Sequence, residues 1–360
     1  MKYEYWFARL KGISAKEKCR IRSLVGSAKA LYYIEEKELE KYDVADKIRQ
    51  IILRQDSMEK LQLDYEELVR KKVQFVTMTE NTYPSRLKQI ASPPYALYYK
   101  GKLPSESQKT VAIIGARECS EYGRTMTKEY ANELTKQGIQ VISGMARGID
   151  GVAQKSALEA GGTSYAVLGC GVDICYPREH YPLYQDIVDN GGILSEFPVG
   201  TEPLKQHFPA RNRIISGLSD VILIMEAKEK SGSLITADMA LEQGKDIYAL
   251  PGLATSALSV GCHQLIKQGA GILISPKDFL MELGICNNSR MKNLTENKIV
   301  LESDENIVYS CLDFQPKNPG YISAVTKLPI QTIMDVLIRL QLKGLIREVS
   351  KNNYVTIRRK

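Results

Sequence analysis

The fold is decided by residues 111–117, VAIIGAR, and residues 139–150, IQVISGMARGID. Each stretch begins with an apolar run of the length of a buried strand and continues into a glycine-containing turn that carries one arginine. Glycine lets backbone N–H groups approach an anion closely, and arginine can bind phosphate through two hydrogen bonds. The two stretches therefore predict neighbouring strands whose carboxyl ends form an anion-binding edge.

Similar apolar runs occur on both sides of these stretches, at residues 73–76, 165–168, 192–194, 221–224, 247–250 and 272–274. Helical patterns separate most of them, at residues 123–137, 149–160, 183–189, 236–243 and 263–267. Continuous apolar strands that alternate with helices predict a parallel sheet covered on both faces, which is a doubly wound α/β fold. Ligands of such sheets bind beyond the carboxyl ends of the strands.

Different patterns flank this central segment. Residues 1–70 predict short amphipathic helices, and Leu10–Ser14 within them is a loose helix-hairpin-helix pattern, for which a plain helical turn is the favoured interpretation. Residues 286–300 have the polar, Asn-rich composition of a linker. Residues 301–360 predict three helices and a two-stranded ribbon, the pattern of a winged helix. The domains are thus expected at 1–70, 71–285 and 301–360.

The charge is unevenly distributed along the chain. The 360 residues have a formal net charge of +7, of which residues 343–360, with six basic residues and one acid, supply +5. A basic C-terminal module on a nearly neutral body indicates two tasks, and a net charge of this size is by itself only weak support for nucleic-acid binding.

Composition excludes several classes of protein. A hydrophobic content of 44% and a charged content of 25% are typical of a soluble globular protein. No apolar stretch has the length of a membrane span and the first residues do not resemble a signal peptide, so we expect a cytoplasmic protein without membrane contact. The 7 cysteines form no CxxC pair, which argues against a disulfide framework and a zinc ribbon. We expect no metal site.

The turn Ser143–Gly148 precedes a predicted helix for which Asp150 is a plausible N-cap, so the turn is expected to cradle phosphate at the positive end of the helix dipole. The second candidate element is the segment 205–218, which holds Lys205, Phe208, Arg211, Asn212 and Arg213. An exposed Phe beside cations and an amide suits single-stranded nucleic acid. The alternative is a core Phe with arginines on a solvated helix face.

Seven blocks in this order resemble the DprA/Smf family of DNA-processing proteins. They are GAR at 115–117, SGxARGID at 143–150, GxGxDxxYP at 169–177, SExP at 195–198, FPxRNRIIxGL at 208–218, SGSLIT at 231–236 and PG at 251–252. The resemblance is dense over about residues 72–285. It implies an extended Rossmann-like domain that binds single-stranded DNA and forms homodimers, and a recombination mediator that loads the recombinase RecA during natural transformation.

Carried onto matching positions, the resemblance implies a DNA site without a catalytic residue or cofactor, comprising Arg117, Ser143, Gly144, Arg147, Gly148, Phe208, Arg211, Asn212 and Arg213. Lys205 is added as a basic neighbour. Many family members also carry a sterile-alpha-motif (SAM) or helix-hairpin-helix-like N-terminal domain and a C-terminal winged helix. The chain departs from the family at Gln154, where His is usual, and at His263, where Asn is common.

One alternative function and the role of the winged helix remain open. The turns contain neither GxGxxG nor a P-loop, so a dinucleotide oxidoreductase and a P-loop ATPase are poorly supported. A nucleotide phosphoribohydrolase on the same fold is the alternative function, with residues 231–236 as a phosphate loop and Glu196 and Glu242 as a carboxylate pair. The winged helix could contact duplex DNA through Arg339, Gln341 and Lys343, or it could contact protein.

Overall fold

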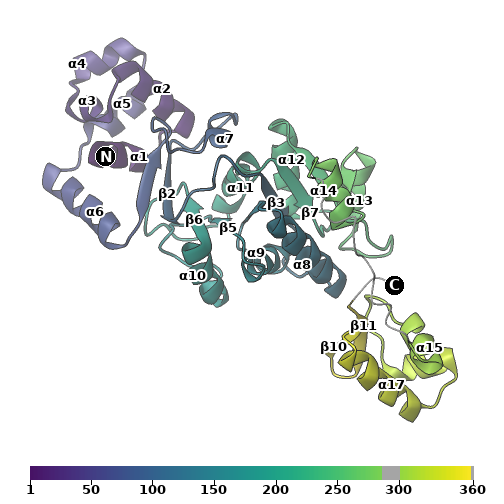
Figure 1. The fold of residues 1–360 in the computed structure, drawn as a ribbon. Coiled ribbons are helices and arrows are strands. Elements are labelled where there is room, and N and C mark those ends of the chain that lie inside the picture. Colours follow the sequence, from purple (N-terminus) through teal and green to yellow (C-terminus); the bar gives the residue numbers. More distant parts are fainter. Residues whose placement is uncertain (286–300, 358–360) are drawn as a thin grey trace. The chain divides into compact units, whose positions relative to one another are not determined.

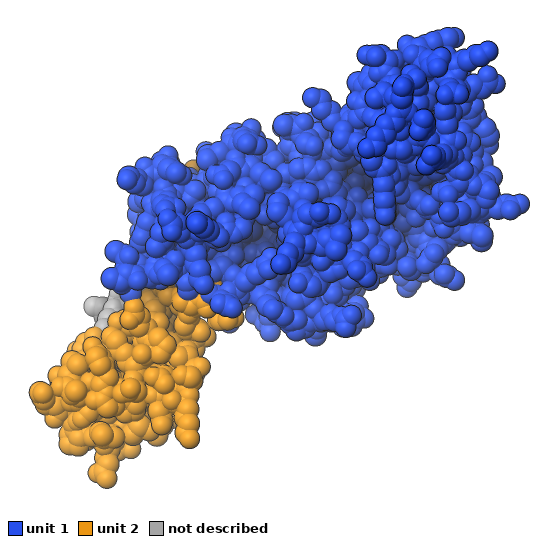
Figure 2. All heavy atoms as spheres, turned by 180° about the vertical axis from the view of Figure 1, so that it is seen from behind, with its two compact units in different colours: residues 1–118, 127–279 blue, residues 119–126, 280–360 orange. Residues whose placement is uncertain are grey.

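The computed structural model describes residues 1–285 and 301–357, so the predicted linker at 286–300 lies outside the described residues. The chain forms two compact units, one of residues 1–118 and 127–279 and the other of residues 119–126 and 280–360 (Figure 2).

The first unit is built on a nine-stranded sheet with the order β1-β2-β6-β5-β4-β3-β7-β8-β9 (Figure 1). All neighbouring strands from β6 to the edge strand β9 in that order pair in parallel. At the other edge, β2 pairs antiparallel with both β1 and β6. The predicted, mostly parallel sheet is thereby confirmed. The strands are β1 (Gln74–Thr77), β2 (Ala96–Gly101), β3 (Thr110–Ile114), β4 (Gln140–Ser143), β5 (Ser164–Val167), β6 (Gly191–Ser195), β7 (Val221–Ile224), β8 (Asp246–Ala249) and β9 (Gly271–Ile272).

Strand β2 was not predicted from the sequence. Its residues Ala96–Gly101 include two tyrosines, a lysine and a glycine, so they do not form the continuous apolar run that marks the parallel strands. The strand lies between β1 and β6 and pairs antiparallel with both, a position that tolerates the mixed pattern.

Helices cover both faces of the sheet, with α9 and α10 on one face and α11 and α12 on the other (Figure 1). The predicted helices are present within a few residues of their expected bounds, and the segment around Phe208 forms a further helix. The elements are α7 (Ser85–Lys88), α8 (Glu121–Lys136), α9 (Ile149–Glu159), η2 (Arg178–His180), α10 (Tyr181–Asn190), α11 (His207–Leu218), α12 (Gly232–Glu242), α13 (Val260–Lys267) and α14 (Pro276–Glu282).

Strand β3 is the first of the parallel strands along the chain, and β4 and β7 pair with its two sides. The chain winds outward through β4, β5 and β6 on one side and then crosses to β7 and β8 on the other. The direction of winding therefore reverses between β3 and β7. A crevice at the carboxyl ends of these two strands is where a sheet of this topology binds its ligand.

The N-terminal helices share an apolar core with the sheet. Trp6 and Phe7 are fully buried, and the ring of Phe7 lies 5.3 Å from that of Tyr95, just before β2. The turn considered as a helix-hairpin-helix joins α1 to α2, where the Ser14 side chain caps α2 by accepting from the Glu17 amide. The helices are α1 (Lys2–Arg9), α2 (Ala15–Val25), α3 (Ala28–Tyr33), α4 (Glu36–Leu39), η1 (Glu40–Tyr42), α5 (Asp46–Leu53) and α6 (Met58–Arg70).

The C-terminal residues form the three helices and ribbon of a winged helix, as predicted. Helix α17 buries the four residues that its sequence pattern placed on one face, namely Ile333, Val336, Leu337 and Leu340. The elements are α15 (Ser303–Cys311), α16 (Pro319–Thr326), α17 (Ile330–Leu342), β10 (Ile346–Ser350) and β11 (Asn353–Thr356), and the two strands pair antiparallel.

No single helix among the described residues is long and apolar enough to cross a membrane. The pair α16 and α17 meets that test only when the two are counted together, across a bend of 113°.

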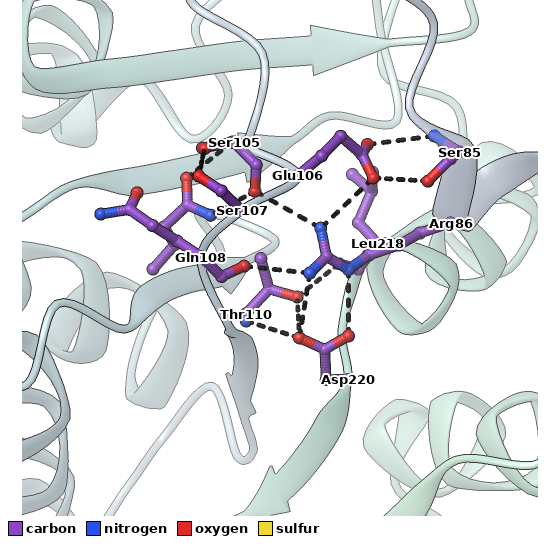
Figure 3. Close-up of polar contacts among 10 residues, drawn as sticks. Ser85, Arg86, Ser105, Glu106, Ser107, Gln108, Thr110, Leu218 and Asp220 are labelled. Atoms are coloured by element: carbon purple, nitrogen blue, oxygen red, sulfur yellow. Dashed lines mark hydrogen bonds and ion pairs between the residues drawn. The ribbon is translucent and has the colours of Figure 1, made fainter. Parts of the chain in front are cut away.

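A polar cluster joins the amino ends of β3 and β7, at the opposite edge of the sheet from the predicted site (Figure 3). The Asp220 carboxylate accepts hydrogen bonds from Arg86 Nε at 3.0 Å and from the backbone amide of Thr110 at 2.8 Å. The Arg86 Nη2 group also donates to the Gln108 carbonyl at 2.9 Å. Partial burial by itself raises the pKa of Asp220. The hydrogen bonds from Arg86 and Thr110 outweigh this effect and hold that pKa below its ordinary value.

We expect Asp220→Asn to lower the free energy of unfolding by about 1–3 kcal/mol at neutral pH, because Arg86 then loses its charged acceptor. A depressed carboxyl pKa stabilises the fold above the unfolded pKa of Asp, about 3.9, and this stabilisation is lost as the pH falls through the folded-state pKa. The difference between the two proteins should therefore shrink in acid, as urea titrations at neutral and acidic pH would show. The control is Asp246→Asn, an exposed carboxyl at the start of β8; an equal loss in the control would contradict the assignment.

Candidate functional site

A cavity of about 710 Å³ opens at the carboxyl ends of β3 and β7. It lies at the reversal point of the sheet, as the topology requires. Its walls come from the segments that follow β3, β4, β5, β6 and β7 and from the beginnings of α11 and α12. The lining residues that the following paragraphs use are Arg117, Glu118, Asp150, Tyr176, Lys205, Phe208, Arg211, Asn212, Lys228, Lys230, Ser231, Gly232, Ser233 and Thr236.

Five of the ten predicted site residues line this cavity: Arg117, Lys205, Phe208, Arg211 and Asn212. Arg117 and Lys205 are exposed, and Phe208 and Asn212 are half-buried. The structure thus brings together residues from the turn after β3 and from the segment around α11, which are about ninety positions apart in the sequence.

The ring of Phe208 is surrounded by cations and by a second aromatic ring. The guanidinium carbons of Arg117 and Arg211 lie 5.7 Å and 5.9 Å from its centroid, within cation–π distance. The ring of Tyr176 lies 5.7 Å away. Gly169 makes room for Phe208, because a Cβ at position 169 would lie 3.0 Å from the ring. Phe208 is therefore neither a fully exposed platform nor a core residue, the two interpretations that its sequence context suggested.

Arg211 is almost completely buried and forms the floor of the cavity. Its Nη1 group donates to the carbonyl of Gly144 at 2.8 Å and to that of Val167, while its Nε has no hydrogen-bond partner. Burial lowers the pKa of Arg211 to about 10, against the opposing charge of Asp150. At position 144 a Cβ would lie 2.5 Å from Arg211 Nη1 and 2.7 Å from Asp150 Oδ2. The guanidinium and the carboxylate therefore require a glycine here.

The prediction that Asp150 is the N-cap of α9 is wrong. Gly148 is the N-cap, with φ of 70°, and Asp150 lies within the first turn of the helix. The Asp150 carboxylate turns inward and accepts from the Gly144 amide at 3.1 Å, and the Ile149 amide donates to the Ala116 carbonyl at 3.1 Å. Burial raises the pKa of Asp150, although Arg211 and the backbone amides around it oppose this shift.

The start of α9 is thus occupied by the protein's own acceptors. Ser143 is buried and donates to the Ile113 carbonyl at 2.7 Å, so it faces the sheet. Gly144 and Gly148 are in tight contact with neighbouring groups, since a Cβ at position 148 would lie 2.2 Å from the Ala116 carbonyl oxygen. These three predicted phosphate ligands are not among the residues that line the cavity.

The remaining two predicted arginines have acidic partners outside the cavity lining. Arg213 makes two hydrogen bonds to the Glu196 carboxylate, at 2.8 Å and 2.6 Å, with both side chains mostly buried. Arg147 is exposed and pairs with Glu179 of η2. The sequence alone did not indicate that Glu196 and Glu179 pair with these two arginines.

The beginning of α12 also belongs to this site, which was not predicted from the sequence. Ser231 caps the helix, and Ser231, Gly232 and Ser233 line the cavity together with Lys228 and Lys230. The signal was present in the block at 231–236, which matches the family but was given a phosphate-binding role only in the alternative enzyme. Glu196 and Glu242, the carboxylate pair of that enzyme, are not among the residues that line the cavity.

Two departures from the family pattern have structural explanations. Gln154 is fully buried in α9 and donates to the Tyr165 carbonyl of β5 at 3.0 Å, so it joins a helix to the sheet. His263 Nε2 lies 3.1 Å from the Gly252 carbonyl oxygen, next to the end of β8. Among residues 1–285 and 301–357, no group of three or more His, Cys, Asp or Glu could hold a metal ion.

Known proteins resemble this chain in sequence and in fold. Residues 74–284 match the family described as DNA recombination-mediator protein A. Protein Smf of Synechocystis is 36% identical over 318 residues, which cover 79% of this chain and 80% of the relative. The crystal structure of DNA processing protein A (DprA) from Streptococcus pneumoniae is similar, with a TM-score of 0.68, 33% identity and coverage of 78% of this chain and 98% of that one.

A third relative, DNA processing protein A of Helicobacter pylori, is described for its single-stranded-DNA binding mode; it has a TM-score of 0.54, 34% identity and coverage of 59% of this chain and 97% of that one. The family match spans more than half of the chain and includes every residue that lines the cavity. The chain belongs to the DNA recombination-mediator protein A family.

Proposed function

We propose that the cavity binds single-stranded DNA and that the protein acts by binding rather than by catalysis. The observation that carries this proposal is the lining of the cavity, where the four exposed cations Arg117, Lys205, Lys228 and Lys230 face one exposed acid, Glu118. The two buried charges, Arg211 and Asp150, balance one another. A positive cavity with an aromatic ring suits a strand whose bases are unstacked.

The two sides of the cavity have different chemistry. On one side, the Arg117 guanidinium lies over the Phe208 ring and offers a planar cation on which a base can stack. On the other, Lys228, Lys230 and the first residues of α12 lie together, and the start of a helix favours phosphate. We assign the base to the first side and the phosphate to the second. Bases in duplex DNA are already stacked and paired, so duplex should bind less well.

We expect Arg117→Ala to weaken the binding of single-stranded oligonucleotides about tenfold, since stacking contributes about 1–3 kcal/mol per base. Lys230→Ala should weaken binding and reduce the slope of log affinity against log salt by about 0.7, the value for one phosphate on a single strand. Fluorescence anisotropy at several salt concentrations measures both quantities. Lys88→Ala, an exposed lysine of α7, is the control. If Arg117→Ala bound single strands as tightly as the wild type, the cavity would not be the DNA-binding site.

The resemblance also implies that the protein loads RecA onto incoming single strands in the cytoplasm, and we include this in the proposal. A mediator must hold the strand while the recombinase assembles. Arg117→Ala should therefore also delay RecA assembly on strands coated with single-strand-binding protein, followed by the ATPase activity of RecA. Loading at the wild-type rate by a variant that no longer binds DNA would contradict this role.

We propose that two copies of the chain pair through the edge of the sheet at β9. This strand is the last in the sheet order, and an edge strand presents unpaired backbone groups. Apolar side chains are exposed in the same region, with Ile272 of β9 46% exposed and Leu241 of α12, which packs on β8, 57% exposed.

Ile272→Glu should convert the dimer to a monomer, because a charge would be buried at the interface. Sedimentation velocity measures the change. The control variant, Lys88→Ala, should sediment as a dimer like the wild type. A variant that sediments like the wild type would place the interface elsewhere.

We propose that the winged helix contacts protein rather than duplex DNA. One of its three predicted base readers, Lys343, is held by the buried carboxylate of Glu305 at 2.6 Å, while Arg339 pairs with Glu302 at 2.8 Å in the open. Among the exposed side chains of α17 are two apolar ones one turn apart, Ile338 at 52% and Leu342 at 83% exposure. Exposed apolar groups on one face indicate a protein-binding surface.

Deletion of residues 298–360 should leave the affinity for duplex DNA unchanged, although it removes the basic C-terminal segment. Gel-shift titrations of duplex and single strand with the full and shortened chains test this. A selective loss of duplex binding would assign the winged helix to DNA.

A further inference from the structure

A short surface segment beside the cavity combines exposed aromatic rings with cations, most of which the cavity itself does not use. It consists of Tyr176, Arg178 and Tyr181, from the turn after β5 through η2 to the start of α10, together with Arg147 from the turn after β4. We call these four residues the η2 surface. Tyr176 is 43% exposed and Tyr181 57% exposed, and Arg178 and Arg147 are also exposed.

The η2 surface is continuous with the cavity. Tyr176 lines the cavity and its ring lies 5.7 Å from that of Phe208, while Arg178 and Tyr181 follow within five positions of the chain. A nucleic acid that leaves the cavity past Phe208 therefore meets Tyr176 first. The next aromatic ring along η2 is that of Tyr181.

Contacts beneath the η2 surface hold it in place. His180 Nδ1 lies 3.1 Å from the Met145 carbonyl oxygen, and a Cβ at position 151 would lie 2.7 Å from the His180 ring. Tyr181 lies nearly parallel to Tyr184, with ring centroids 6.2 Å apart and 7° between the planes. Tyr184 is buried and donates to the Val172 carbonyl at 2.5 Å. An exposed ring supported from below can stack a base without ordering a mobile side chain first.

The size of the cavity makes a contact outside it necessary for a longer strand. A volume of about 710 Å³ is that of a site for one drug-sized ligand, enough for one or two nucleotides. Proteins that bind single strands commonly contact about 4–16 nucleotides. The strand must therefore continue over the surface, and cations with aromatic rings are the groups that hold it there.

We propose that the η2 surface is a second contact for single-stranded nucleic acid, in which Tyr181 stacks a base and Arg178 and Arg147 bind the flanking phosphates. The inference rests on the proposed function of the cavity and extends it by naming the direction in which the strand leaves. Arg147 is paired with Glu179 in the free protein, and both side chains are exposed, 65% and 50% respectively. Water screens such a pair, so phosphate can replace the carboxylate.

The test is a series of oligothymidylates from about 4 to about 16 nucleotides, the range of single-strand site sizes, with affinities measured by fluorescence anisotropy. Tyr181→Ala should weaken the longer oligomers about tenfold and leave the shortest unchanged, because the shortest fit inside the cavity. Tyr181→Phe keeps the ring and should bind like the wild type. Tyr33→Ala, a tyrosine of α3 that is 59% exposed, is the matched control.

Two charge variants provide an independent measurement. Arg178→Ala should reduce the salt slope of the longer oligomers by about 0.7, whereas Tyr181→Ala should leave that slope unchanged. Glu179→Gln should strengthen the binding of longer oligomers, because it frees Arg147 from its partner. Melting temperatures of all variants should match the wild type, since the altered side chains are exposed.

The outcomes separate this inference from the proposal on which it rests. If Arg117→Ala weakens every length while the Tyr181 and Arg178 variants bind every length like the wild type, the cavity binds DNA and the η2 surface does not. If Arg117→Ala has no effect at any length, the cavity proposal fails. A change in sedimentation of Tyr181→Ala without a change in DNA affinity would make the η2 surface a protein contact and overturn the inference.

Discussion

The site depends on one buried pair of charges, Arg211 and Asp150, packed around Gly144. Each charge loses its hydration, and neither would be stable alone in this position. The cost is offset because Arg211 donates to two main-chain carbonyls and Asp150 accepts from main-chain amides, so both charges are bound to the ends of the strands. Helix α11 and the start of α9 are thereby held at fixed positions over the sheet.

The position of α11 in turn determines what the cavity contains. Phe208, Arg211 and Asn212 are three and four residues apart, so they share one face of the helix and line the same wall. Arg213 leaves that face and is held by Glu196. The pair of Arg211 and Asp150 also explains why the starts of α9 and α12 differ. Asp150 fills the start of α9 with an internal carboxylate, whereas the start of α12 opens into the cavity beside two lysines.

Much of this arrangement could be predicted from the sequence. Apolar runs located the parallel strands, and the rule that ligands bind at their carboxyl ends predicted that Arg117 and the α11 segment lie together. Strand β2 was not predicted, because an antiparallel strand near the edge of a sheet needs no continuous apolar run. Ser231 and Ser233 at the start of α12 belonged to a block that was given a phosphate-binding role only in the alternative enzyme, and the exposed Lys228 and Lys230 just before it carry no motif that would mark them.

The sequence by itself determined the class of fold, the edge of the sheet that carries the site and the family, because these follow from periodicity, from the order of short motifs and from the residue types in them. Only the tertiary structure decided what each arginine does. Arg117, Arg147, Arg211 and Arg213 have the same side chain and all follow glycine- or proline-containing turns, yet Arg117 faces the cavity, Arg211 is buried beneath it, Arg213 is held by Glu196 and Arg147 lies outside. The difference arises from burial and from the acidic partner of each residue, which depend on segments distant in the chain.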